Sequence, residues 1–192
     1  RAVIVTTGTF LNGLLHIGLA ASPGGRLDEP RSSLLSAALG RAGIKLGRLK
    51  TGTSPRGAAS GINLERLNIQ AGDEPPVPFS LRTRSLSIRQ MPCYITRTNE
   101  KTHALIRNSL DRSPLYTGKI IGAGPRYCPS IETKVVRFRD RDSHLVFIEP
   151  EGRTADECYL NGLSTSLPED VQAEMLHSIA GLENARITRP GY

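Results

Sequence analysis

The nine residues 124–132, which read GPRYCPSIE, restrict the backbone strongly and place a cysteine inside that restriction. Gly124 and Pro125 favour a turn, because glycine relaxes backbone sterics and proline fixes φ. Pro129 suits the first residue of a short helix, where its missing N–H costs nothing. The sequence therefore predicts a turn that leads into a helix, with Cys128 at the helix cap.

A cysteine in that position has two chemical uses. The helix N-terminus and the neighbouring Arg126 both favour a thiolate, so we expect the pKa of Cys128 to be lowered. The same unpaired N–H groups would also hold a phosphate or a pyrophosphate. Both uses make the stretch an active-site loop, whereas the plainer alternative is a buried structural cysteine beside a rigid turn.

The composition is that of a folded protein with an excess of positive charge. Hydrophobic residues make up 38% and charged residues 22% of the 192 residues, which fits one large or two small globular domains. The formal net charge of +7 favours an anionic partner such as nucleic acid or a phosphorylated cofactor, although a generally basic protein has the same charge. Only 5% of the residues are aromatic, so stacking on single-stranded bases is weakly supported.

Cysteine and histidine usage narrows the class of protein further. The three cysteines, Cys93, Cys128 and Cys158, are widely spaced and odd in number, which indicates the reducing cytoplasm and not a disulfide framework. The four histidines are scattered without ligand spacing, so we predict no metal site. No apolar run reaches the length of a membrane span. The chain opens without Met on a strand-like run, and we expect it to be an internal piece of a longer protein.

Short β-branched or alternating runs predict strands, and longer runs with apolar residues every three or four positions predict helices. The expected strands are residues 2–6, 14–19, 44–49, 79–88, 93–96, 144–148 and 158–160. The expected helices begin at Ser32 or Ser33, at Asn99 and at Ser166, and Gly43 and Gly181 end the first and the last. A strand that runs into a turn at Gly8, as residues 2–6 do, is typical of a nucleotide-binding α/β sheet.

Two groups of charged residues have alternative interpretations. Three basic residues surround the Gly/Thr loop at residues 51–53, which suits a phosphate, or else they form a solvated basic edge. These residues are Arg48, Lys50 and Arg56. Glu149 and Glu151 stand one residue apart, which suits acid–base chemistry, but a turn or surface position is the better interpretation.

Several segments carry a family resemblance. They read TTGTFLNG from Thr6, HIGL from His16, GGR from Gly24, GRLKTGTSPR from Gly47, PCYITRTNEKTH from Pro92, GPRYCPSIETKVVRF from Gly124, EPEG from Glu149, NGLSTSLP from Asn161 and RPGY from Arg189. By these motifs the chain resembles the GidA/MnmG family, flavoproteins that modify wobble uridines of tRNA. The long run that includes Cys and Tyr positions is far more specific than a short glycine pattern.

The resemblance implies an α/β fold, part of a FAD/NAD(P)-binding Rossmann-like domain with an inserted, strand-rich α+β nucleotide-binding subdomain. Residues 1–56 would belong to the FAD-binding domain and residues 57–123 to the inserted subdomain associated with the nicotinamide nucleotide. Residues 124–192 would form the signature loop and the return to the FAD-binding domain. The chain has no GxGxxG turn for the flavin pyrophosphate, so we expect it to bind flavin poorly by itself.

The resemblance also implies roles for single residues. Cys128 would be the cysteine tied to activity, as nucleophile or as proton-transfer group. Gly8 would let the backbone approach the flavin, and Ser32 would contact the flavin or simply cap its helix. The implied cofactor-binding residues of the signature are Gly124, Pro125, Arg126, Tyr127, Cys128, Pro129, Ser130, Ile131, Glu132, Thr133, Lys134, Val135, Val136, Arg137 and Phe138.

The activity implied by the resemblance uses FAD, NADH and a folate one-carbon donor. Together with a partner GTPase, the full-length protein, as a homodimer, would add a carboxymethylaminomethyl or aminomethyl group at C5 of the tRNA wobble uridine. The chain alone is expected to be inactive. The alternatives are a folate- and flavin-dependent tRNA uridine methyltransferase, a basic tRNA-binding module without catalysis, and a docking platform for the GTPase.

Overall fold

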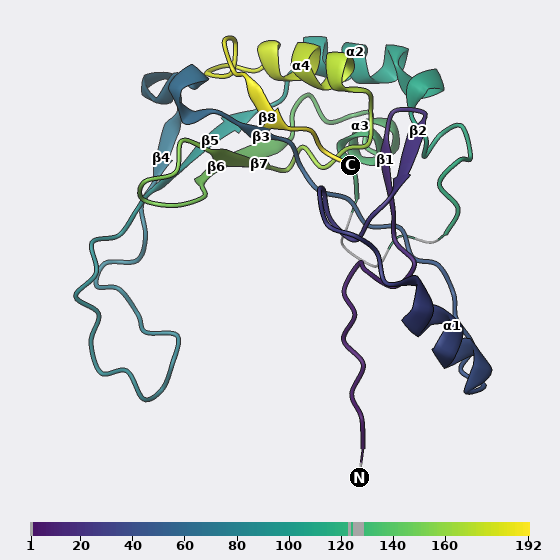
Figure 1. Cartoon of the computed structure of the whole chain (residues 1–192). Coiled ribbons are helices and arrows are strands. Elements are labelled where there is room, and N and C mark those ends of the chain that lie inside the picture. Colours follow the sequence, from purple (N-terminus) through teal and green to yellow (C-terminus); the bar gives the residue numbers. More distant parts are fainter. Residues whose placement is uncertain (1, 123, 125–128) are drawn as a thin grey trace.

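The centre of the molecule is one antiparallel sheet of six strands, in the order β4-β5-β6-β7-β3-β8 (Figure 1). The computed structural model describes residues 2–122, 124 and 129–192. The strands are β3 (Arg56–Gly57), β4 (Asn68–Gln70), β5 (Cys93–Arg97), β6 (Leu145–Pro150), β7 (Cys158–Asn161) and β8 (Ile187–Arg189). A separate hairpin is formed by β1 (Leu14–Ile17) and β2 (Ala20–Pro23).

Helices α2 (Glu100–Asn108) and α4 (Glu169–His177) cover one face of this sheet, and α3 (Ile131–Arg137) packs against α2 (Figure 1). Helix α1 (Ser33–Arg41) lies away from the sheet. Three short 3₁₀ helices complete the described secondary structure: η1 (Ala59–Gly61), η2 (Leu64–Arg66) and η3 (Leu110–Arg112).

Alternation along β6 decides which face of the sheet is buried. Val146 and Ile148 are fully buried and point toward the helices, whereas Leu145 is 42% exposed. Because side chains alternate along a strand, Leu145, Phe147 and Glu149 share the opposite face. The core between sheet and helices consists of Ile62, Leu67, Ile106, Ile131, Val135, Val146, Ile148, Cys158, Leu160, Leu163, Leu167, Val171, Met175, Leu176, Ile179, Leu182 and Ala185. In the described part of the chain, no helix covers the opposite face (Figure 1).

Two parts of the chain extend away from this core (Figure 1). Near the N-terminus, Val3 and Ile4 are 90% and 87% exposed, and α1 buries none of its residues. The long connection from β4 to β5 carries the fully exposed side chains of Phe79 and Leu81. Its base is held where the side-chain amide of Gln90 donates a hydrogen bond to the carbonyl oxygen of Asp73, at 2.6 Å.

The expected elements that reach the core are confirmed, with adjusted ends. Strands occur inside or close to the expected residues 14–19, 93–96, 144–148 and 158–160. Asn99 caps α2 as expected: its side chain accepts a hydrogen bond from the backbone N–H of Thr102, which returns a bond in a capping box. The last helix begins at Glu169 and not at Ser166, because Pro168 occupies its N-cap.

The strands expected at residues 2–6, 44–49 and 79–88 are wrong: these residues form no strand. Their sequences favour extended backbone, but a strand needs a neighbour to satisfy its N–H and C=O groups. The described residues provide no such neighbour for these three runs. The six-stranded sheet draws residues from all three expected segments, 1–56, 57–123 and 124–192, since β3 begins at Arg56. The division into these segments stays a prediction.

Gln172 on α4 holds the C-terminal turn against the core. Its amide donates to the carbonyl oxygens of Leu167 (2.6 Å) and Gly191 (3.0 Å) and accepts from the N–H of Gly191 (2.7 Å). Replacing Gln172 by Leu leaves buried backbone groups without partners, and we expect the free energy of unfolding to fall by about 2–3 kcal/mol. Chemical denaturation measures this. The same change at exposed Gln70 should alter it by less than about 0.5 kcal/mol, and equal effects at both sites would contradict this account.

A pair of histidines makes stability depend on pH. Thr98 Oγ1 accepts the backbone N–H of His144 at 2.8 Å and shares a second hydrogen bond of 2.8 Å with His103 Nε2. Burial lowers the pKa of His103, and burial together with His103 and Lys134 lowers the pKa of His144. The unfolded chain therefore binds more protons below its histidine pKa of about 6.5, and stability should fall as the pH is lowered through that value.

Thermal unfolding followed between acidic and neutral pH tests this prediction. Replacing His103 by Gln should flatten the pH dependence, because one of the two imidazoles with a lowered pKa is removed. A melting temperature that rises as the pH falls below neutral would contradict it.

Candidate functional site

The signature segment begins its helix later than the sequence predicted. Helix α3 starts at Ile131, and Ser130 is the N-cap, its hydroxyl accepting a hydrogen bond from the N–H of Thr133 at 3.3 Å. The expectation that Pro129 opens the helix with Cys128 at the cap is therefore wrong. A serine oxygen satisfies one of the free N–H groups of the first turn, which a proline cannot do. Residues 123 and 125–128, including Pro125, Arg126, Tyr127 and Cys128, lie outside the described residues.

The described part of the signature divides into packing and polar positions. Ile131 and Val135 are buried in the core, so their first role is packing. Lys134 donates a hydrogen bond to the carbonyl oxygen of Gly162 (3.1 Å), and burial lowers its pKa. Val136 is half-buried, while Arg137 and Phe138 lie exposed, with the guanidinium 6.0 Å from the ring centroid. Gly124 lies beside Lys50, whose carbonyl oxygen is 3.9 Å from where a Cβ of Gly124 would be.

Glu132 is the one carboxylate of the signature, and it is completely buried. Its Oε1 accepts hydrogen bonds from the hydroxyl of Thr165 (2.9 Å) and the N–H of Ser166 (3.4 Å). Its Oε2 is also buried and has no hydrogen-bond partner among the described residues. Burial raises the pKa of Glu132 in spite of these hydrogen bonds. The carboxyl group is thus a fixed, easily protonated link between α3 and the segment before α4.

Backbone hydrogen bonds extend this link to the Gly/Thr loop at residues 51–53. The N–H of Thr165 donates to the carbonyl oxygen of Thr53 (3.3 Å), and the N–H of Thr53 donates to that of Tyr192 (3.0 Å). Close packing accompanies the contact, because a Cβ on Gly191 would lie 2.8 Å from the carbonyl oxygens of Thr53 and Thr165. Four motifs that are far apart in the sequence therefore meet beside the described end of the signature loop.

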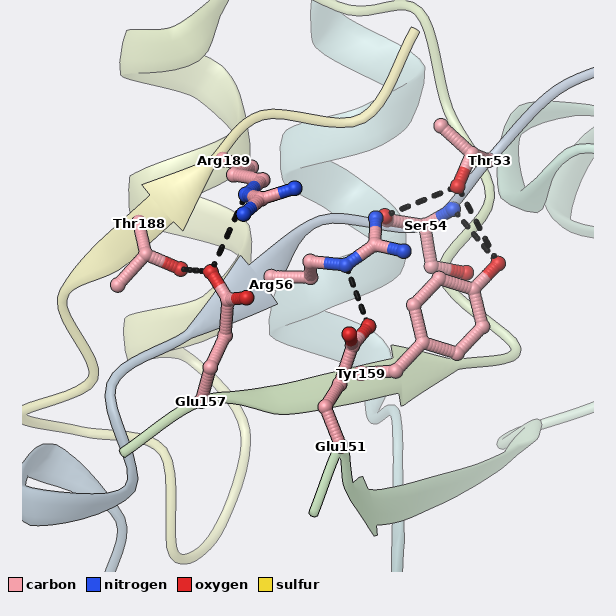
Figure 2. A network of polar contacts seen from close by, with 8 residues as sticks. All are labelled: Thr53, Ser54, Arg56, Glu151, Glu157, Tyr159, Thr188 and Arg189. Atoms are coloured by element: carbon pink, nitrogen blue, oxygen red, sulfur yellow. Dashed lines mark hydrogen bonds and ion pairs between the residues drawn. The ribbon is translucent and has the colours of Figure 1, made fainter. Parts of the chain in front are cut away.

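A polar network continues from Thr53 onto the open face of the sheet (Figure 2). The hydroxyl of Tyr159 accepts a hydrogen bond from the N–H of Ser54 (3.1 Å) and lies 3.4 Å from Thr53 Oγ1. The guanidinium carbon of Arg56 is 5.0 Å from the centroid of the Tyr159 ring, and its Nε donates to Glu151 Oε1 at 2.5 Å. Strand pairing places Arg56 directly opposite Tyr159. The sheet register therefore builds this arrangement.

The electrostatics of the network act on Tyr159. Burial raises the pKa of Tyr159, but the hydrogen bonds from Ser54 and Thr53 and the charge of Arg56 outweigh it, so the pKa lies below that of an ordinary tyrosine. A phenol with a lowered pKa is a better hydrogen-bond donor at neutral pH. Sequence reasoning missed Tyr159, because a lone tyrosine in a strand carries no motif of its own.

The neighbouring strand edge is fixed by Glu157 (Figure 2). It accepts a hydrogen bond from the hydroxyl of Thr188 (2.6 Å) and pairs with Arg189 Nε at 3.5 Å. These contacts hold β8 in place beside β3. Because β8 pairs with β3, Glu157 also helps to fix the strand that carries Arg56.

The three basic residues expected around residues 51–53 have different surroundings. Arg48 donates to the carbonyl oxygen of Asn12 (3.4 Å), whereas Arg56 is paired with Glu151. Of the two glutamates one residue apart, Glu151 holds Arg56 and Glu149 accepts from Asn161 (2.8 Å). Both glutamates line one hollow on the open face of the sheet. Sequence reasoning named the basic group and the glutamate pair separately but could not bring Arg56 and the glutamates together.

The two expected flavin contacts lie in the N-terminal part of the chain. Gly8 occupies a turn at φ +56°, and a Cβ there would meet nothing within 4 Å. Ser32 stands at the N-cap position of α1, but its hydroxyl makes no capping hydrogen bond. Its backbone is held instead by Phe10 and Asn12, through N–H···O bonds of 2.9 and 3.0 Å. The hydroxyl of Ser32 is therefore not used in the way that the N-cap interpretation required.

Two negative findings apply to the described residues alone. They contain no group of three His, Cys, Asp or Glu side chains arranged to hold a metal ion. None of their helices is both long enough and apolar enough to cross a membrane.

Comparison with known proteins shows the family of the chain. The family model described as glucose inhibited division protein A, GIDA, matches residues 1–192. The chain belongs to the GidA/MnmG family. It is 57% identical over 192 residues to the tRNA uridine 5-carboxymethylaminomethyl modification enzyme MnmG of Thermodesulfovibrio yellowstonii, and 55% identical to that of Campylobacter fetus. In both comparisons the matched region covers 100% of this chain and 31% of the relative, so the chain spans about a third of the length of these relatives.

A solved structure of the family shares the fold. The crystal structure of Aquifex aeolicus GidA in its form I superposes with a TM-score of 0.88 at 50% identity, covering 97% of this chain and 32% of that chain. The form II crystal gives a TM-score of 0.86 at 47% identity. The mixed α/β arrangement described above, with its six-stranded antiparallel sheet, is thus part of a GidA structure.

The buried carboxyl of Glu132 generates a test of the site. In Glu132→Gln the side-chain oxygen still accepts from Thr165 and Ser166, but an amide NH₂ group takes the place of Oε2, which has no partner among the described residues, so we expect the free energy of unfolding at neutral pH to fall by less than in Glu132→Ala. In Glu132→Ala it should fall by about 2–4 kcal/mol, because a cavity forms and the Thr165 hydroxyl loses the acceptor of its proton.

The raised pKa of Glu132 also predicts how its contribution to stability changes with pH. The unfolded carboxyl group ionises at about pH 4.3, whereas the folded one holds its proton longer, so the contribution of Glu132 to stability should decrease as the pH rises above that value. Denaturation of the wild type and the Gln variant at several pH values measures the difference. If Gln costs as much as Ala at neutral pH, Glu132 is ionised in the folded protein and this account is wrong.

Proposed function

We propose that this chain is part of a flavin-dependent enzyme that modifies C5 of the wobble uridine in tRNA. The observation that carries the proposal is its similarity, over all 192 residues, to proteins named tRNA uridine 5-carboxymethylaminomethyl modification enzyme. The relatives are about three times longer, so the activity belongs to a protein of that length. By this proposal the full reaction uses FAD, NADH, a folate one-carbon donor and a partner GTPase, in a cytoplasmic homodimer.

The residues of the N-terminal part fit a flavin. The open turn at Gly8 leaves space for a group that approaches the backbone, and the hydroxyl of Ser32 is not spent on its helix cap. Gly8 and Ser32 would hold the cofactor together with the signature residues. The exposed apolar side chains of Val3 and Ile4 fit a strand of a Rossmann-like sheet that further sequence of the family would complete. A bound flavin would supply redox chemistry driven by NADH.

Within the signature, Ser130 and Glu132 have different tasks. Ser130 ends the loop by capping α3, and Glu132 fixes the first turn of α3 to Thr165 and Ser166. Residues 124–138 would then present a loop of fixed direction to the nicotinamide nucleotide. This role rests on the anchoring of the described residues and on the resemblance of the whole segment.

Cys128 is the proposed reactive group. C5 of uridine is a poor nucleophile, and addition of a thiolate at C6 moves the ring electron pair toward C5 and O4, so that C5 can attack an electrophilic one-carbon unit. The thiolate leaves again when the proton at C5 is lost. The alternative role, proton transfer at the same carbon, also needs a thiol at that place. Because Ser130 caps α3, activation of Cys128 would come from Arg126 and not from a capping position.

Replacing Cys128 by Ser should abolish modification and leave the fold intact. The measurement is the content of modified wobble uridine in tRNA, by nucleoside mass spectrometry, with circular dichroism as the test of folding. Cys93→Ser is the matched control, since Cys93 is a free, half-buried cysteine in β5, and it should retain activity. A fully active Cys128→Ser variant would favour a docking platform or a binding module and would refute the proposal.

A further inference from the structure

The open face of the sheet carries a hollow that no step of the proposed reaction has used. Its volume is about 300 Å³, at the lower end of the range of small-molecule sites. It lies where β3 and β7 pair, close to the end of β6. The lining residues are Thr53, Arg56, Glu149, Pro150, Glu151 and Tyr159.

The Tyr159 hydroxyl has a proton available for a ligand. Its oxygen accepts the backbone N–H of Ser54, so one lone pair is fixed. Thr53 Oγ1 also lies near this oxygen, but at 3.4 Å, well beyond the usual O–H···O distance of about 2.8 Å. The O–H bond can therefore turn into the hollow without loss of a good hydrogen bond.

Arg56 offers a second set of donors beside this hydroxyl. Glu151 binds Nε and so fixes the guanidinium over the Tyr159 ring. The two terminal nitrogens make no hydrogen bond to any described residue. Arg56 and Tyr159 thus present neighbouring donors from paired strands, with Figure 2 showing both side chains on the same side of the sheet.

The charge of the hollow selects against an anion. Arg56 contributes one positive charge, whereas Glu149 and Glu151 line the same hollow with one negative charge each. A phosphate would meet this surplus of carboxylates at close range. A neutral ring with a carbonyl oxygen for the donors and an adjacent N–H for a carboxylate meets no such cost, and its binding satisfies both kinds of group.

We propose that this hollow binds the imide edge of a uracil-type base, with Tyr159 and Arg56 donating to one ring carbonyl and Glu149 accepting the imide N–H. The inference rests on the proposed function in that it names the residues which hold the base, but it concerns binding alone. Donors at the carbonyl also stabilise the negative charge that the oxygen gains when a nucleophile adds to the ring. Tyr159 and Arg56 are therefore positioning and charge-stabilising residues of the site.

The test follows the Tyr159 hydroxyl directly, in the chain labelled with ¹³Cζ-tyrosine. The signal of Tyr159 is the one that disappears in Tyr159→Phe. Millimolar uridine should shift this signal, while 3-methyluridine, which lacks the imide N–H, and inorganic phosphate should not. A shift with phosphate and none with uridine would overturn the proposal in favour of an anion site, and no shift with any probe would overturn it outright.

Variants separate recognition from folding. Tyr159→Phe and Glu149→Gln should each weaken uridine binding roughly tenfold, measured by calorimetry or by the remaining tyrosine signals. Tyr94→Phe is the matched control, because Tyr94 lies in the same sheet with its ring packed against the core, and it should bind uridine normally. Unchanged binding in Tyr159→Phe would refute the assignment. Uridine binding and tRNA modification are separate measurements, so the two proposals can fail separately. Loss of uridine binding in Tyr159→Phe tests the hollow, whereas loss of modification in Cys128→Ser tests the reactive group.

Discussion

The buried hydrogen bond between Glu132 and Thr165 is the contact on which the arrangement of motifs depends. It ties the first turn of α3 to the segment before α4, and the backbone of Thr165 carries the connection on to Thr53. Two hydrogen bonds satisfy one oxygen of this buried carboxyl group, and burial raises its pKa. The signature segment therefore ends on a rigid base, and Cys128, the proposed reactive group, precedes that base in the sequence.

The two faces of the sheet have separate tasks. The face under α2 and α4 holds the apolar core and supplies the stability of the chain. The open face holds Arg56, Tyr159 and the two glutamates, whose positions come from strand register and from salt bridges between side chains. Because the core side is packed and the open side is not, polar residues on the open side are free to serve a ligand. A site placed on strands is also more precise than one placed on loops.

Three parts of the chain extend away from the core and expose apolar side chains. The apolar residues near the N-terminus, helix α1 and the connection from β4 to β5 contribute nothing to the core. Family relatives of about three times this length match the chain over its whole sequence. Exposed apolar segments of this kind fit contacts with other parts of such a protein.

The sequence by itself determined the family, the cap of α2 by Asn99 and the strand expected at residues 144–148. These features are local, because capping and alternation act within a few residues. The tertiary structure alone decided that residues 2–6, 44–49 and 79–88 form no strand in the described chain, since pairing requires a neighbour that propensity cannot supply. It alone decided that Ser130 and not Cys128 caps α3. It also brought Arg56, Glu151 and Tyr159 together, because residues about a hundred positions apart meet only through sheet register.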